Sequence, residues 1–252
     1  MKVWLYTLCW NEMAILPFVV EYWEKLSLEK VVVYDNGSTD GSLEFLASIP
    51  YVEIRHFDSD GMNDVIQRDI KNSCWKEAVG KADFVIVCDM DELLYSDDFE
   101  GELQKMKDGG YNVLGCKWYT LCEDFMPEHQ KGVLLHTQCH KFYSQRIQKV
   151  RPDLGKFTLF DPNLVDDMRY GVGCHYSCVR PQLSLYETNG ISGIHIDKGF
   201  GVDYMIRRRG FMNNRLSETN RKNNYCFEYG FSAEKIREEY ANNQKVSFDI
   251  NV

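Results

Sequence analysis

Short apolar runs alternate with stretches of helical periodicity through the first half of the chain. The runs have strand length and predict strands at residues 3–9, 30–34, 51–56 and 83–88. The helical stretches lie between them, at residues 12–26, 43–48 and 62–80. Strands that alternate with helices favour a mainly parallel sheet with right-handed connections, flanked by helices. We therefore expect an α/β fold.

The second half of the chain has a weaker pattern. Strands are predicted at residues 113–119 and 190–197, and helices at residues 201–216 and 232–242. The stretch between residues 121 and 173 shows loops and short strands without a clear period. We expect this half to form a smaller region that covers the active edge of the sheet.

Composition narrows the class of protein. A net charge of -9 argues against a protein that grips a nucleic-acid backbone, and no apolar stretch reaches the ~18 residues of a membrane span. The nine cysteines lack the paired spacing of a zinc site, so buried reduced thiols are the better interpretation. The N-terminal residues do not look like a signal peptide. We expect a cytoplasmic protein with no nucleic-acid partner, which would meet a membrane only peripherally.

Two carboxylates follow the apolar run at residues 83–88, namely Asp89 and Asp91. In open α/β sheets, ligands bind outside the carboxyl ends of the strands. Carboxylate oxygens in that position can bind Mg²⁺ or Mn²⁺, and such an ion would clamp two phosphates and act as a Lewis acid. The alternative is a solvated acidic turn that caps a helix.

A second polar loop, residues 35–42, follows the run at residues 30–34. The Asp35 carboxylate could accept hydrogen bonds from a base or from ribose hydroxyls, and the glycines would let the backbone approach a ligand closely. Asn-Gly and Asp-Gly pairs are also ordinary turn residues, which is the alternative explanation.

Three motifs together resemble a known family. They are Cys-Trp-Asn-Glu at residues 9–12, Val-Tyr-Asp-Asn-Gly-Ser-Thr-Asp-Gly-Ser at residues 33–42 and Cys-Asp-Met-Asp-Glu at residues 88–92. Their order and spacing resemble the family-two-like glycosyltransferases of the type A (GT-A) fold. The resemblance implies a single domain over residues 1–252, with a nucleotide-sugar-binding half at residues 1–95 and an acceptor-side half at residues 96–252.

The resemblance also implies an activity. Such an enzyme moves a sugar from a nucleotide-diphosphate donor, here a UDP-sugar, to a hydroxyl of a glycan or lipid-linked glycan, with Mn²⁺ or Mg²⁺ as cofactor. We expect an inverting enzyme of bacterial surface polysaccharide synthesis. Two alternatives stay open: a non-catalytic nucleotide-sugar-binding module, and an Asp-x-Asp phosphohydrolase, whose acidic pair usually follows the first strand.

Roles pass to residues of this sequence by the same resemblance. The implied metal ligands are Asp91, Asp89 and, from the second half, His175, which ends the segment Tyr-Gly-Val-Gly-Cys-His at residues 170–175. His195 is the second candidate for the histidine ligand, although contact with the diphosphate or the acceptor is the favoured role for it. The implied donor contacts are Asn11, Glu12, Asp35, Asn36, Arg68, Asn72, Asp89, Met90, His195 and Lys198. For Arg68, a surface cation on a helix is an equal alternative.

The catalytic base and a basic cluster complete the predictions. An inverting transferase needs a carboxylate that takes the proton of the acceptor hydroxyl. A retaining enzyme, which is the alternative, would need no such base. Asp124 and Glu123, after the strand at residues 113–119, are the candidates, and an ordinary acidic loop is the alternative. A basic cluster could hold the diphosphate or an anionic lipid-linked acceptor, or form a solvated helix face; its members are Arg207, Arg208, Arg209, Arg215, Arg221 and Lys222.

Overall fold

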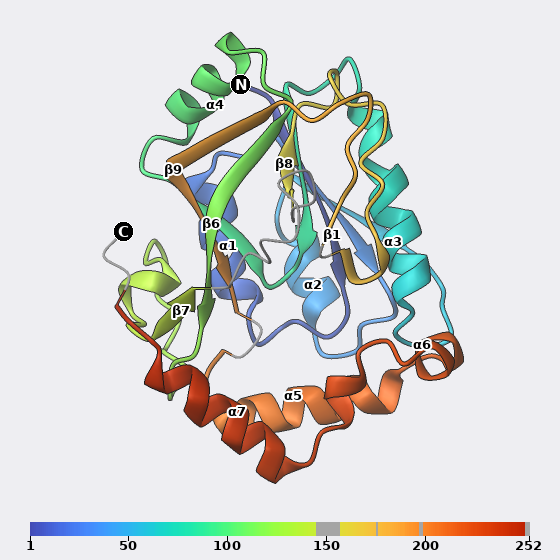
Figure 1. Ribbon diagram of the computed structural model, residues 1–252, viewed down its shortest axis with the longest axis vertical. Coiled ribbons are helices and arrows are strands. Elements are labelled where there is room, and N and C mark those ends of the chain that lie inside the picture. Colours follow the sequence, from blue (N-terminus) through green and yellow to red (C-terminus); the bar gives the residue numbers. More distant parts are fainter. Residues whose placement is uncertain (145–156, 175, 197–198, 250–252) are drawn as a thin grey trace.

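The computed structural model describes residues 1–144, 157–174, 176–196 and 199–249. Within these residues the strands form one nine-stranded sheet in the order β3-β2-β1-β4-β8-β6-β9-β5, with β7 beside β6 (Figure 1). Both halves of the chain contribute strands to this sheet. The predicted α/β class is confirmed.

The first four strands form the parallel part of the sheet. They are β1 (Val3–Cys9), β2 (Lys30–Asp35), β3 (Val52–His56) and β4 (Phe84–Asp89). In the register of β1, Cys9 lies opposite Asp35 of β2, and Leu8 lies opposite Asp89 of β4. The parallel register therefore brings the polar ends of β1, β2 and β4 to one edge of the sheet.

The second half extends the sheet in mixed directions. Its strands are β5 (Glu92–Tyr95), β6 (Val113–Leu121), β7 (Phe142–Ser144), β8 (Leu159–Phe160) and β9 (Leu185–His195). β8 runs antiparallel to β4 and β6, whereas β6 and β9 are parallel. β5 runs antiparallel to β9, with Glu92 opposite His195. This last pairing places the residues around Asp91 beside the end of β9.

Helices cover the sheet and one of its ends. They are α1 (Leu16–Lys25), α2 (Ser42–Ala47), α3 (Asp64–Ser73), α4 (Phe99–Asp108), α5 (Val202–Arg215), α6 (Glu218–Asn223) and α7 (Ala233–Lys245). Short 3₁₀ turns are η1 (Cys74–Ala78), η2 (Leu135–Thr137), η3 (Val172–Cys174) and η4 (Phe227–Gly230). In Figure 1, α5, α6 and α7 lie together across the bottom of the molecule, below the strands.

Two apolar cores lie on opposite faces of the sheet because neighbouring residues of a strand point in opposite directions. Leu5 and Ile86 belong to the core on the face covered by α1. Tyr6 and Val85 belong to the other core, which includes Trp75 of η1. Burial on both faces explains why β4 reads as an unbroken apolar run.

Several elements differ from the prediction. Helices α4 and α6 were not predicted, and β9 begins at Leu185, before the strand predicted at residues 190–197. The helix predicted at residues 62–80 begins later, at Asp64, because the Asn63 side chain accepts hydrogen bonds from the amides of Val65 and Ile66 and so caps it. It then changes into η1 at Cys74. Strand β5 was not predicted, since four residues are too few to show a period.

Candidate active site

A cavity of about 220 Å³ opens at the carboxyl edge of the parallel strands. Its walls come from the loops after β1, β2 and β4, from α3, and from α5 of the second half. Of the predicted site residues, six line it: Glu12, Asn36, Asp89, Met90, Asp91 and His195. Arg208, Arg209 and Arg215 of the predicted basic cluster also line it. So do four charged residues to which the sequence assigned no role: Asp64, Lys71, Glu92 and Glu228.

The loops after β1 and β2 are joined into one wall. The Asn11 side-chain oxygen accepts a hydrogen bond of 2.7 Å from the amide of Thr39, and the Asn11 amide donates one of 2.9 Å to Ser38 Oγ. The Glu12 amide donates to Ser42 Oγ at 3.0 Å. Asn11 therefore shapes the wall, and Glu12 extends from it into the cavity.

Asp35 lies beneath this wall and is fully buried. Its carboxylate accepts hydrogen bonds from the amides of Gly37, at 2.8 Å, and Ser38, at 3.2 Å from the same oxygen. Gly37 has φ +78°, which favours glycine over residues with a Cβ. In this state Asp35 organises the turn, and its neighbour Asn36 faces the cavity.

An indole, an amide and a guanidinium lie together at one end of the cavity. Arg215 Nη2 donates to the backbone oxygen of Asn36 at 2.9 Å and also to its side-chain oxygen. The Arg215 guanidinium carbon lies 3.9 Å from the centroid of the Trp10 ring. Burial lowers the pKa of Arg215, which still leaves the group charged at neutral pH. This end offers an aromatic face and hydrogen-bonding groups, which suit a nucleobase.

Lys71 of α3 holds the first aspartate of the pair. Its ammonium lies 2.6 Å from Asp89 Oδ1, and only 5% of the residue is exposed. Burial disfavours the charged form of Lys71, but the Asp89 carboxylate outweighs burial and raises the pKa above its ordinary value. The Asp89 amide donates to Glu92 at 3.1 Å. Lys71 thus holds the side chain of Asp89, and Glu92 holds its backbone amide.

The two residues of α3 that the sequence suggested lie elsewhere. Arg68 donates to Asp69 at 2.9 Å and 2.7 Å, next to it on the helix. Asn72 exchanges two hydrogen bonds with the backbone of Tyr170, at 3.1 Å and 2.7 Å. Neither lines the cavity. The residues of this helix that line the cavity are Asp64, Gln67 and Lys71, the last of them one residue before Asn72.

Asp91 takes part in a four-residue charged cluster with Glu12, His195 and Arg208. Arg208 contacts both oxygens of Glu12, at 2.8 Å and 3.1 Å, and Asp91 Oδ2 at 3.3 Å. His195 Nε2 lies 3.7 Å from the same Asp91 oxygen. Burial raises the pKa of Glu12, and Arg208 only partly offsets that effect. Burial opposes the charge on Arg208, but Glu12 and the other acidic neighbours raise its pKa well above the usual value.

The donor chemistry of Asp91 and His195 fits a divalent ion such as Mn²⁺, which accepts carboxylate and imidazole ligands. Among the described residues, no three or more His, Cys, Asp or Glu side chains are grouped so that together they could hold a metal ion. His175 and Lys198, predicted as a metal ligand and a donor contact, lie outside the described residues. Cys174, which precedes His175, lines the cavity. Met90, between the two aspartates, is buried in the cavity wall.

The structure does not support Glu123 and Asp124 as residues of this cavity. The buried Glu123 carboxylate accepts hydrogen bonds from the amides of His140, at 2.9 Å, and Lys141, at 3.3 Å. Asp124 pairs with the side chains of Lys141 and Gln244, and these hydrogen bonds lower its pKa. Neither residue lines the cavity. Their contacts instead join the strand β6 to the segments that follow it.

The three arginines at residues 207–209 separate because successive residues of a helix point about 100° apart. Arg207 is exposed, Arg208 enters the cavity, and Arg209 pairs with Glu239 of α7 at 3.0 Å. They therefore do not form one basic surface patch. Among the described residues, no helix is both long and apolar enough to cross a membrane.

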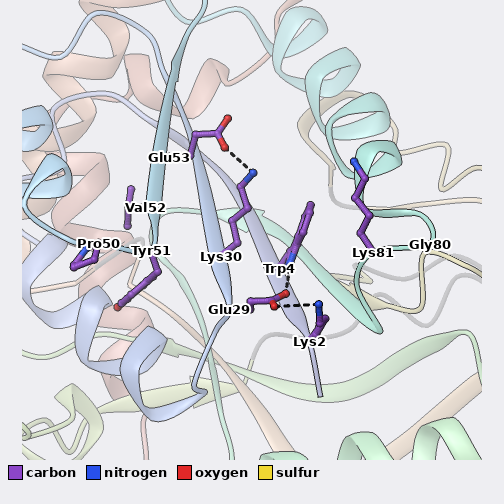
Figure 2. A pocket seen from close by; sticks show the side chains of 10 residues that line it. All are labelled: Lys2, Trp4, Glu29, Lys30, Pro50, Tyr51, Val52, Glu53, Gly80 and Lys81. Atoms are coloured by element: carbon purple, nitrogen blue, oxygen red, sulfur yellow. Dashed lines mark hydrogen bonds and ion pairs between the residues drawn. The ribbon is translucent and has the colours of Figure 1, made fainter.

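A second hollow, of about 650 Å³, lies at the amino ends of β1 and β2 (Figure 2). Most of its charged groups have partners within it: Trp4 donates to Glu29 at 2.7 Å, and Lys30 pairs with Glu53 at 2.6 Å. Lys2 pairs with Glu29 at 3.4 Å. This hollow is far from the polar strand ends and has the features of an ordinary ion-paired surface.

The open sheet and the charged cavity at its carboxyl edge define an α/β protein of the class that binds ligands at that edge. The sequence profile of "Glycosyl transferase family 2" matches residues 7–163. The chain belongs to this family.

Solved structures of S. aureus TarS are similar to the chain. One shares 14% identity and a TM-score of 0.50, covering 96% of this chain and 43% of the TarS chain. A crystal structure of TarS residues 1–349 in complex with UDP-GlcNAc shares 13% identity and a TM-score of 0.47, covering 96% and 72%. The chain thus spans less than half of the first of these proteins, and the likeness concerns the fold alone. A comparison with curated protein sequences gave no match.

Proposed function

We propose that the chain transfers a sugar from a nucleoside diphosphate donor to a hydroxyl of a glycan or lipid-linked glycan, with the donor bound in the cavity at the sheet edge. One observation carries the proposal: the aromatic and amide wall of Trp10, Asn36 and Arg215 shares a cavity with the charged cluster around Asp91. The first suits a nucleoside and the second suits a diphosphate and its metal. A UDP-sugar is the donor class that the motifs imply.

The metal belongs to this proposal. Asp91 and His195 would hold Mn²⁺ or Mg²⁺, with Asp89 and His175 as the further ligands that the family resemblance implies. When bound, such an ion supplies Lewis-acid stabilisation to the departing diphosphate. Lys71 would keep Asp89 ionised and oriented toward the donor, since the two groups lie 2.6 Å apart. Arg208 would add positive charge on the same side.

The finer parts of the proposal concern stereochemistry and setting. We infer an inverting reaction in the synthesis of a bacterial surface polysaccharide, because the three motifs resemble enzymes of that kind. Glu123 and Asp124 are engaged in internal contacts, so the proposal assigns the base to neither. Contact with a membrane, if the acceptor is lipid-linked, would be peripheral.

The phosphohydrolase alternative is weaker. A nucleophilic carboxylate needs an open approach, whereas Asp89 is held by Lys71 and follows the fourth strand and not the first. The non-catalytic alternative predicts nucleotide-sugar binding without turnover. Only an assay of product formation distinguishes this alternative from the proposed transferase.

A thermal-shift screen of nucleotide-sugars with and without Mn²⁺ tests the proposal. A ligand that binds only the folded state raises the unfolding midpoint, so a nucleotide-sugar should stabilise the protein, and more so with Mn²⁺. Asp91→Asn should remove the Mn²⁺-dependent part of the rise in the unfolding midpoint. It should also abolish turnover, measured as the release of nucleotide from the donor. Asp108→Asn, on the surface of α4, is the matched control. Full turnover of Asp91→Asn in excess chelator would contradict the metal part.

A further inference from the structure

Arg208 joins two carboxylates that belong to different loops. It reaches from α5 to Glu12, after β1, and to Asp91, after β4. The side chains of these carboxylates are only 10% and 13% exposed. Two buried carboxylates need a counter-charge, and in the ligand-free protein the guanidinium supplies it.

The same contact conflicts with metal binding. Asp91 Oδ2 is the oxygen that faces both Arg208, at 3.3 Å, and His195, at 3.7 Å. A divalent cation on this oxygen would lie within a few ångströms of the guanidinium, and like charges repel. Arg208 and a metal ion therefore compete for one carboxylate oxygen.

A diphosphate would remove the conflict. Guanidinium groups bind phosphate oxygens through two parallel hydrogen bonds, so a nearby diphosphate offers Arg208 a new anionic partner. The position on α5 suits this role: Arg215, at the nucleobase end of the cavity, lies seven residues further along, which is roughly 10 Å along a helix. Both side chains point into the cavity.

We propose that Arg208 is a positioning residue that couples metal binding to nucleotide binding. In the ligand-free protein it holds Glu12 and Asp91; when a diphosphate binds, it turns to the phosphates and leaves Asp91 to the metal. The inference rests on the proposed function, from which it takes the metal and the diphosphate donor. Its consequence is that the free protein binds the metal weakly and the nucleotide tightens that binding.

Calorimetric titration of the full chain with MnCl₂, alone and with saturating UDP, tests this proposal. We expect UDP to tighten Mn²⁺ binding by about tenfold, and Mn²⁺ to tighten UDP binding by the same factor, because coupling between sites is reciprocal. Uridine, which lacks the diphosphate, should not change the affinity for Mn²⁺.

Two variants should move the Mn²⁺ affinity of the nucleotide-free protein in opposite directions. Arg208→Gln removes the competing charge and should tighten Mn²⁺ binding, whereas Glu12→Gln leaves the guanidinium to Asp91 alone and should weaken it. Arg207→Gln, on the exposed side of the same helix, should behave like the unaltered protein. If Arg208 and Glu12 only supported the structure, the two substitutions would not change the Mn²⁺ affinity in opposite directions.

The outcomes separate this inference from the proposed function. Mn²⁺ binding that is the same or weaker in a folded Arg208→Gln variant overturns the inference and leaves the proposed transferase in place. If Arg208→Gln fails to fold, a Glu12→Gln variant that binds Mn²⁺ as tightly as the unaltered protein overturns it. The absence of Mn²⁺ binding with and without UDP overturns the inference together with the metal part of the proposed function.

Discussion

The ion pair between Lys71 and Asp89 joins a buried side chain to a partly exposed one, so removing either partner should destabilise the protein by a different amount. The Lys71 side chain is 6% exposed, whereas that of Asp89 is 37% exposed. Removing Asp89 leaves a nearly buried ammonium that little water can hydrate, whereas removing Lys71 leaves a carboxylate that is more than a third exposed to water. The two truncations should therefore differ in their effect on the free energy of unfolding.

The size of each effect follows from burial. Breaking a buried pair by removing one partner destabilises a protein by about 3–5 kcal/mol, and we expect Asp89→Ala to fall near that range. For Lys71→Met we expect about 1–2 kcal/mol, because exposed charges lose much less when a pair is broken. Lys76→Met, on the exposed side of η1, is the control and should stay within about 0.5 kcal/mol of the unaltered protein.

Urea denaturation followed by circular dichroism measures these differences. The midpoint should fall in the order control, Lys71→Met, Asp89→Ala, with unchanged slopes if the unfolded state is the same. Donor binding should fall in both variants, since Asp89 loses either its charge or its position. A Lys71→Met variant that is less stable than Asp89→Ala would refute the reasoning from burial.

Three further predictions address other parts of the molecule. His136 is buried against Tyr22, and burial lowers its pKa to about 4, so the unfolded chain takes up its proton first as the pH falls from about 6.5; stability should therefore fall by about 2–3 kcal/mol between pH 6.5 and 4, and denaturation of His136→Gln should show a smaller pH dependence. Arg215→Met should weaken UDP and uridine binding alike, by about tenfold, because the residue lies at the nucleobase end, whereas Arg237→Met on α7 should not; calorimetry with both ligands checks this. Asn63→Ala removes the cap of α3 and should lower stability by about 1 kcal/mol, and equal midpoints for this variant and the unaltered protein would contradict the capping role.

The sequence predicted well which strand ends meet at the carboxyl edge of the sheet. It predicted poorly which residues of the second half lie at that edge. The apolar runs before Asp35 and Asp89 marked strands, and the parallel register brought their ends together as expected. Such a pattern depends only on neighbouring residues. Strand β5 and the partners of Asp91 from the second half depend on contacts between residues about 100 positions apart, which a local period does not contain.

Lys71, which was missed, and two arginines of the predicted basic cluster show what local signals can indicate. Lys71 lies one position before Asn72, and the helical period alone does not decide which residue of a partly polar helix meets the strand end. Arg208 and Arg215 are seven residues apart and therefore share a face of α5, which marks them as a pair. Treating the basic cluster as one group does not distinguish this pair from Arg207 and Arg209.

The pairing of β5 with β9 also has a consequence for the synthesis of the chain. β5 lies at the end of the strand order and pairs with β9. About 100 residues separate the two strands, so Leu93, Leu94 and Tyr95 leave the ribosome long before their partner. At ordinary elongation rates the delay lasts on the order of ten seconds, during which an apolar strand edge is open to other chains. Aggregation of nascent chains should thus depend on how quickly residues 185–195 emerge and dock.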